Sequence, residues 1–258
     1  MDINRLGKVM RLELVMNKSH LLGLAVAGMI IPVSSQLFGW MLGVSTASEA
    51  TNVAELALAV YFMVCGSFIF SNIRSRQALI NNLMLPATNG EKFLSRYVVL
   101  TFGGMAAFFL GFVAGDLAQF VLMLIVHSDL AELALTEFCM DANTAELIGV
   151  PSGIGSFLII LFVHAGFLLT GSLFRKHPFI FSVLFWQAVS MVFFSAVSFA
   201  SLFALKMIQD SQYHVVMYPT PMRIAVITLL VAAIVFCFWF AFKRYKRLEV
   251  IRNKWFNW

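Results

Sequence analysis

Six long apolar stretches run along the chain, separated by short polar segments. They are Leu21–Val44, Val53–Ile73, Tyr97–His127, Pro151–Leu173, Pro178–Leu205 and Arg223–Phe242. Each reaches the roughly 20 apolar residues that are needed to cross a bilayer core of about 30 Å. Because hydrocarbon offers no hydrogen-bond partner to backbone N–H and C=O groups, such segments are helical. The pattern therefore predicts an all-α, polytopic membrane protein with six transmembrane helices.

The composition adds that the chain is one membrane domain. Of its 258 residues, 60% are hydrophobic and 12% are charged, whereas soluble domains carry about 25% charged residues. The six stretches and their connections leave no room for a soluble domain of about 100 residues. We therefore expect residues 1–258 to form a single transmembrane domain.

The charges predict an orientation. Lys and Arg gather before the first stretch, between the second and third, between the fourth and fifth, and in the tail 243–258. The other connections, 128–150 and 206–222 among them, carry mainly acids. Since Lys and Arg mark the cytoplasmic side, we expect both termini in the cytoplasm and these two segments outside. The formal charge of +5 then reflects topology, and we expect no nucleic acid as a partner.

Residues 1–20 have the pattern of an amphipathic helix. The apolar residues on one helical face are Ile3, Leu6, Met10 and Leu14, and the cations on another are Arg5, Lys8 and Arg11. This arrangement suits a helix that lies in the cytoplasmic interface of the membrane, in contact with the lipid bilayer. The alternative is an ordinary basic flank that happens to be helical.

The connection 74–96 has internal order. A short helix is predicted from Ser75 to Leu85, and Pro86 ends it. The run Thr88-Asn89-Gly90-Glu91 matches a capping box that starts a second helix, which leads into the third stretch. A plain turn needs only a few residues. A hairpin of this size therefore indicates a docking surface, although a loop that merely reverses the chain is the simpler alternative.

Between spans two and three, the run Leu85-Pro86-Ala87-Thr88 is followed by Glu91-Lys92 and Ser95-Arg96-Tyr97. This run, together with the order of an interfacial helix and six spans, resembles the type-2 permeases of ATP-binding cassette (ABC) exporters, small bacterial ones in particular. The resemblance implies a bacterial inner (plasma) membrane protein whose loop 74–96 is a coupling helix on a separate ATPase subunit. It also implies a second permease copy or a related permease as partner. In such permeases the connection equivalent to 206–222 forms short re-entrant helices, and an interfacial aromatic belt is the alternative here.

Under this resemblance, the ATPase contact falls on residues of the loop. They are Arg74, Arg76, Leu79, Leu83, Met84, Pro86, Thr88, Glu91 and Lys92. The two arginines would pair with carboxylates, and the apolar residues of the first helix would form a ridge that fills a groove on the partner. The chain has no Gly-x-x-x-x-Gly-Lys-[Ser/Thr] run. ATP and Mg²⁺ are therefore expected on the partner, with no cofactor in this chain.

Four polar residues within the stretches are candidates for a pathway or for helix–helix contacts: Gln36, Asp116, His164 and Gln187. Asp116 lies near the outer end of its span, where we expect it to be solvated. His164 is deep, and we expect a neutral histidine hydrogen-bonded between helices. The two glutamines either bond across helices or line a polar path.

The short external helices expected in 128–150 begin at Asp129–Glu132 and Asn143–Glu146, which resemble helix starts. No spacing of Cys, His or acidic residues matches a metal site or an enzyme motif, so we expect no catalytic site. The leading function is the permease subunit of an exporter. The alternatives are an accessory or immunity membrane protein and, less favoured because buried acids are scarce, an ion-coupled secondary transporter. The sequence does not identify the transported molecule.

Overall fold

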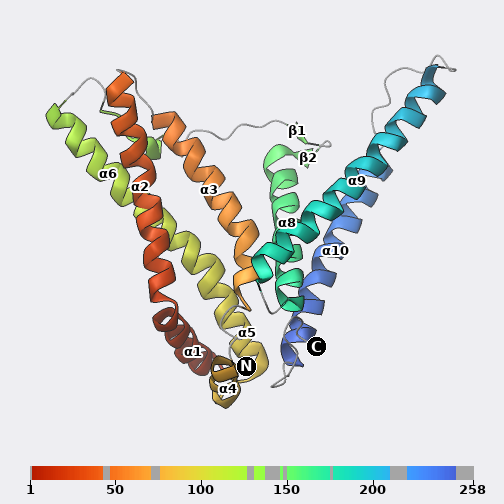
Figure 1. Cartoon of the computed structure of the whole chain (residues 1–258), viewed down its shortest axis with the longest axis horizontal. Coiled ribbons are helices and arrows are strands. Elements are labelled where there is room, and N and C mark those ends of the chain that lie inside the picture. Colours follow the sequence, from red (N-terminus) through yellow and green to blue (C-terminus); the bar gives the residue numbers. More distant parts are fainter. Residues whose placement is uncertain are drawn as a thin grey trace.

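The computed structural model describes residues 2–42, 47–70, 76–126, 131–136, 146–147, 150–174, 177–209 and 220–247. This part of the chain is helical, apart from one hairpin of two-residue strands, β1 (Glu146–Leu147) and β2 (Val150–Pro151). The long helices fan out from one end of the molecule, where α1 and α4 lie (Figure 1). We call it the basal end.

The helices follow the order of the predicted stretches. They are α1 (Ile3–Met16), α2 (Lys18–Leu42), α3 (Ala47–Phe68), α4 (Arg76–Met84), α5 (Asn89–Val98), the π-helical segment η2 (Val99–Gly103), α6 (Gly104–Val126), α8 (Ser152–Leu173), α9 (Pro178–Gln209) and α10 (Thr220–Lys246). The boundaries shift because helices continue into polar sequence that hydropathy does not count. Thus α3 begins ahead of Val53, and α9 passes Leu205.

Four helices of the described chain are long and apolar enough to cross a membrane: Lys18–Leu42, Ala47–Phe68, Asn89–Val126 and Ile227–Lys246. The structure therefore indicates a multi-pass membrane protein. The fourth and fifth predicted spans coincide with α8 and α9, whose fully described apolar portions, Phe157–Leu173 and Pro178–Val192, are shorter than a span. Four of the six predicted spans are thus confirmed, and these two stay predictions.

The helix Asn89–Val126 is longer than a membrane requires. Its 38 residues rise about 57 Å at 1.5 Å per residue, nearly twice the roughly 30 Å of a bilayer core. Its first turns, in α5, bury polar residues, Glu91, Lys92, Ser95 and Arg96. We therefore place the polar first turns of α5, up to Arg96, in the basal end and the membrane-spanning part beyond them.

Glycines set how closely the long helices approach one another. A Cβ on Gly111 of α6 would overlap the carbonyl of Ala25 in α2, and one on Gly28 would overlap the carbonyl of Phe108. The two backbones are therefore in direct contact. A Cβ on Gly66 of α3 would likewise crowd the α8 backbone. Small residues permit this kind of packing between helices in a membrane.

The connection 128–150 agrees with expectation in one part and differs in another: residues 134–136, just after the predicted helix start Asp129–Glu132, are helical. Asp129 and residues 143–145 lie outside the described residues, but Glu146 and Leu147 form strand β1 instead of the predicted helix. The reason is local pairing, since β1 meets β2 across a two-residue connection. A re-entrant helix or an aromatic belt is predicted for 206–222, and most of this segment also lies outside the described residues, which end at Gln209 and resume at Thr220.

Candidate functional site

The α4–α5 hairpin at the basal end has the predicted construction. Helix α4 ends at Met84, Pro86 lies exposed in the bend, and α5 follows. The capping box is confirmed: Thr88 Oγ1 accepts from the Glu91 N–H at 3.3 Å, and Glu91 Oε2 accepts from the Thr88 N–H at 2.9 Å. These two reciprocal bonds fix the start of α5.

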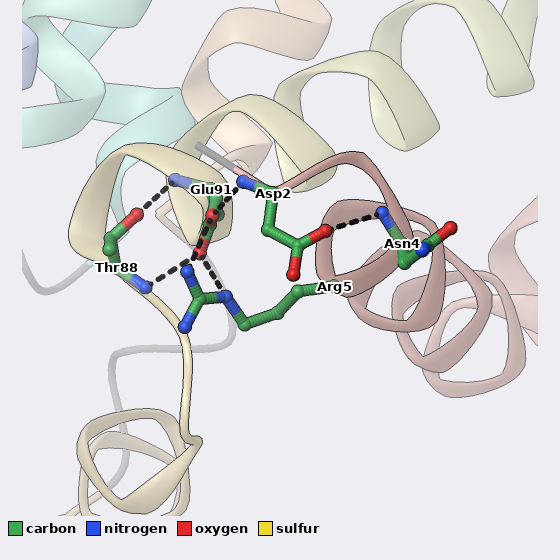
Figure 2. A network of polar contacts seen from close by, with 5 residues as sticks. All are labelled: Asp2, Asn4, Arg5, Thr88 and Glu91. Carbon is green, nitrogen blue, oxygen red and sulfur yellow. Dashed lines mark hydrogen bonds and ion pairs between the residues drawn. The ribbon is translucent and has the colours of Figure 1, made fainter.

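Glu91 also binds the beginning of α1, as Figure 2 shows. Its Oε1 accepts from the backbone N–H of Asp2 at 3.0 Å and from Arg5 Nη2 at 3.3 Å. Arg5 Nε lies 3.1 Å from Glu91 Oε2. The side chain of Glu91 is fully buried, whereas that of Arg5 is 44% exposed. We call this arrangement the Glu91 clamp, and it ties α1 to α5.

The clamp changes the acidity of its carboxyl group. The backbone N–H groups of Asp2 and Thr88, with a smaller contribution from Arg5, lower the pKa of Glu91 to about 2. Each of these donors stabilises the ionised form and leaves the protonated form with fewer partners. Glu91 is therefore a carboxylate throughout the ordinary pH range.

A second set of contacts fastens α4. Lys92 Nζ in α5 donates to the Asn82 carbonyl of α4 at 2.6 Å, and Asn82 Nδ2 donates to the hydroxyl of Tyr245 in α10 at 3.3 Å. Lys92 is 4% exposed, and this burial lowers its pKa. Tyr245 also packs against Phe93 of α5, with ring centroids 5.3 Å apart and the ring planes tilted by 59°. Helix α4 is thus held by both α5 and α10.

A buried charge lies in the same junction. Arg96, in the last turn of α5, is 2% exposed, and its Nε and Nη2 atoms find no hydrogen-bond partner among the described residues. Glu13 of α1 is also buried and interacts with Arg96 electrostatically. Its Oε2 accepts from Asn17 Nδ2 at 3.1 Å.

Sequence reasoning missed this pair. It counted Arg96 as a basic flank and did not consider Glu13. The available signal was that Glu13 is the one acid in residues 3–20, where every other charged residue is Lys or Arg. It missed Asn82 and Tyr245 as well, because nothing local in the sequence relates two residues that are 163 positions apart.

The predicted docking ridge is described in part. Leu83 is 45% exposed and Met84 is 79% exposed. Arg76 and Leu79 lie in α4, but their side chains are outside the described part of the chain, and Arg74 is outside it altogether. The hairpin therefore presents apolar side chains at the surface of α4 while Lys92 and Glu91 bind other elements beneath.

His164 connects three helices. It is fully buried in α8, with Nδ1 2.6 Å from the Phe62 carbonyl of α3 and Nε2 3.1 Å from the Tyr97 hydroxyl of α5. A carbonyl can only accept, so Nδ1 carries the proton and Nε2 accepts from Tyr97 in a neutral imidazole. The prediction of a histidine hydrogen-bonded between helices is confirmed.

Asp116 is not solvated, and that expectation was wrong. It is 1% exposed, and its carboxylate accepts from the backbone N–H groups of Ala134 and Leu135, at 3.0 and 2.9 Å, and from Gln119 Nε2 at 2.9 Å. These donors replace water around the charge. Asp116 therefore fastens the segment 131–136 onto the middle of α6.

The two predicted glutamines have different surroundings. Gln36 is buried in α2 and, with Gln119 of α6, lines a cavity of about 120 Å³. Gln187 is exposed on α9. The structure thus brings Gln36 next to α6 and places Gln187 on a surface, so these two side chains do not form one polar path.

No protein family, curated protein or solved structure matches this chain. The geometry of the basal end is therefore the basis for a function. Its hairpin is bonded to other helices on one side and exposes Leu83 and Met84 on the other. Such a part can receive a partner at α4 and pass a displacement to α1, to α10 and to the long helix that α5 begins.

Proposed function

We propose that this chain is the membrane permease subunit of an ABC exporter and that a separate ATPase subunit drives it. The observation that supports this most is the α4–α5 hairpin, in which Leu83 and Met84 are exposed while Asn82, Glu91 and Lys92 bind other helices. A coupling element needs both features. An exposed apolar ridge can fill a groove on a partner, and fixed attachments carry the movement onward.

The proposed route of the movement follows the contacts. A displacement of α4 is transmitted to α10 through the Asn82–Tyr245 hydrogen bond. It is transmitted to α5 through the Asn82–Lys92 hydrogen bond. Helix α5 continues without a break into η2 and α6, so its displacement tilts a membrane-spanning helix. Because the Glu91 clamp ties α1 to α5, α1 moves together with α5.

The remaining parts of the proposal rest on the sequence. Because the chain has no P-loop run, we assign ATP and Mg²⁺ to the partner and no catalytic site to this subunit. We assign the basal end to the cytoplasm of a bacterial inner membrane, since the basic segments meet there. A second copy or a related permease completes the pathway.

The test is whether the ATPase still co-purifies with this chain after acidic residues replace Leu83 and Met84. Leu83→Glu combined with Met84→Glu places two charges in the proposed contact and changes no membrane span. We expect the ATPase encoded beside this chain to be lost from the complex purified in mild detergent. The control is Asn89→Glu, an exposed position of the same hairpin at which an acid suits the start of a helix. It should keep wild-type recovery.

Wild-type recovery and full ATP hydrolysis by the double variant in liposomes would reject the coupling role. Purification of a stable complex with some other partner, and with no ATPase, would instead support the accessory or immunity class. The Asn89→Glu control separates a specific effect of the ridge from a general effect of negative charge on the hairpin.

A further inference from the structure

The segment 131–136 makes hydrogen bonds to two membrane-spanning helices at once. Asp116 of α6 accepts from the backbone N–H groups of Ala134 and Leu135 at 3.0 and 2.9 Å. In the same segment, the carbonyl of Ala134 accepts from Thr51 Oγ1 of α3 at 2.9 Å. The segment therefore connects α3 with α6.

Gln119 adds a further polar contact between the segment and α6. Its Nε2 donates to the Glu132 carbonyl at 2.9 Å and to Asp116 Oδ1, also at 2.9 Å. The side chains of Gln119, Asp116 and Thr51 are all buried. Without the segment, Asp116 would lose two of its donors, and a buried carboxylate that loses donors is strongly destabilised.

Apolar packing brings the segment into contact with the same two helices. The side chain of Ala134 is buried in a cluster with alanines of α3 and phenylalanines of α6, namely Ala47, Ala50, Ala54, Phe108 and Phe112. With Thr51, the alanines give the first turns of α3 a face of small side chains. Such a face lets another backbone approach closely. The Thr51–Ala134 hydrogen bond shows that the segment lies on it.

This connection lies away from the basal end. Helix α3 begins at the end of the molecule opposite to α1 and α4 (Figure 1), and Thr51 is close to that start. About 15 Å further along α3, Tyr61 donates to the Leu100 carbonyl of η2, and a Cβ on Gly104 would overlap the Tyr61 hydroxyl. Helix α3 is thus fixed to the long helix Asn89–Val126 at two levels.

We propose that the segment 131–136 is a strap that locks the part of α3 remote from the basal end to α6, so that α2, α3 and α6 move as one body. Helix α2 belongs to this body because its backbone touches that of α6 at Gly28 and Gly111. Asp116 and Thr51 hold the strap from its two sides. The lock itself does not depend on the proposed transport function.

Within the proposed transport function, on which this consequence rests, the strap limits where the helices can separate. A displacement of α5 moves α6, since the two belong to one continuous helix, and the strap makes α3 follow. Helix α3 also packs on α8, where a Cβ on Gly66 would crowd the α8 backbone. The relative movement therefore occurs between α3 and α8, and not between α3 and α6.

The first experiment measures the distance between α3 and α6 by double electron–electron resonance in lipid nanodiscs. Spin labels are attached to Leu56→Cys and Val121→Cys, at exposed positions of the two helices, in a chain that keeps only the buried Cys65 of its native cysteines. We expect one narrow distance distribution in the unaltered strap. Asp116→Asn, in which an NH₂ group replaces one of the two acceptor oxygens, should make the distribution about twice as wide.

Hydrogen exchange of residues 131–136 shows whether the strap is released in the same samples. We expect exchange about tenfold faster in Asp116→Asn, because local opening then costs less free energy. Unchanged exchange would show that Asp116 does not hold the segment. Faster exchange with an unchanged distance distribution would show that the segment lies on the two helices without locking them. Either result would overturn the proposal.

Matched threonine variants assign the effect to the bond with α3. Thr51→Val removes the donor to Ala134, so it should broaden the α3–α6 distribution, and it replaces Asp116→Asn as the deciding variant if that chain fails to fold. The control is Thr136→Val, which removes a hydroxyl that donates to the Leu133 carbonyl within the segment. It should keep the narrow distribution. A width in Thr51→Val equal to that of the control would overturn the role of Thr51 in the lock.

The second experiment tests the consequence for transport in the complex with the ATPase encoded beside this chain. Leu56→Cys is paired with Phe157→Cys at an exposed position of α8, and ATP with vanadate is added. We expect the α3–α8 distance to shift and the α3–α6 distance to stay unchanged. A shift between α3 and α6 alone would overturn the lock. No shift in either distance would contradict the proposed transport function, whereas the lock is decided by the chain alone.

Discussion

At the scale of single residues, Glu91 shows why the basal end needs a carboxylate and not merely a polar group. The backbone N–H of Asp2 and the side chain of Arg5 donate to Oε1, while the backbone N–H of Thr88 donates to Oε2. An amide offers one acceptor oxygen and would turn an NH₂ group toward one of these donors. The capping box alone needs a single acceptor from Glu91, so the second oxygen serves the attachment of α1.

The residue-scale prediction is a pH dependence of α1 docking. The folded-state pKa of Glu91, about 2, lies below its ordinary value of 4.5. The clamp therefore contributes fully above about pH 4.5 and is lost progressively as the pH falls from there toward 2. We expect hydrogen exchange of the α1 amides to be slow at pH 7, to accelerate over that acidic range, and to be fast already at pH 7 in Glu91→Gln. After correction for intrinsic exchange, a flat profile in the wild type would contradict the clamp. Glu49→Gln, at an exposed acid of α3, is the control and should match the wild type.

At the scale of elements, hydropathy and local motifs predicted most of what the structure contains. Apolar runs placed α2, α3, α6 and α10, and Pro86 with the Thr88–Glu91 capping box placed the α4–α5 hairpin. Each of these signals lies within a few neighbouring residues. The prediction failed where a contact joins distant segments: Asp116 was expected in water because its partners lie 18 and 19 residues further on. The Glu13–Arg96 pair was missed for the same reason.

The contact between α2 and α6 gives the element-scale prediction. Gly111→Ala places a methyl group onto the Ala25 carbonyl, so the two helices must separate or distort. Overpacking of this kind costs about 1–3 kcal/mol, and we expect a lower thermal unfolding midpoint in detergent. Gly23→Ala in α2 is the matched control because no atom lies within 4 Å of the added carbon. A midpoint for Gly111→Ala as high as that of the control would show that this backbone contact is absent.

At the scale of the whole molecule, the α4–α5 hairpin contacts both the first and the last helix of the described chain. Helix α1 binds α5 through the Glu91 clamp, and α4 binds the last turn of α10 through Asn82 and Tyr245. The segment 131–136 is held on Asp116 in the middle of α6. Glu91 of the basal end and Asp116 are 25 residues apart on one continuous helix, about 38 Å at 1.5 Å per residue, which is comparable with the thickness of a bilayer core.

The prediction at this scale is that the basal end is cytoplasmic, because Lys and Arg collect on that side of a membrane. In a chain in which Cys139 and Cys237 are replaced by Ser, a single cysteine is introduced at Met84, Arg247 or Glu132, each of which is exposed. A membrane-impermeant maleimide added to intact cells should label Glu132→Cys and should label Met84→Cys and Arg247→Cys only after lysis. Cys65, which is buried, remains in all variants and should stay unlabelled in a chain with no introduced cysteine. Labelling of Met84→Cys or Arg247→Cys in intact cells, with Glu132→Cys protected, would invert the orientation and place the proposed ATPase contact on the side without ATP.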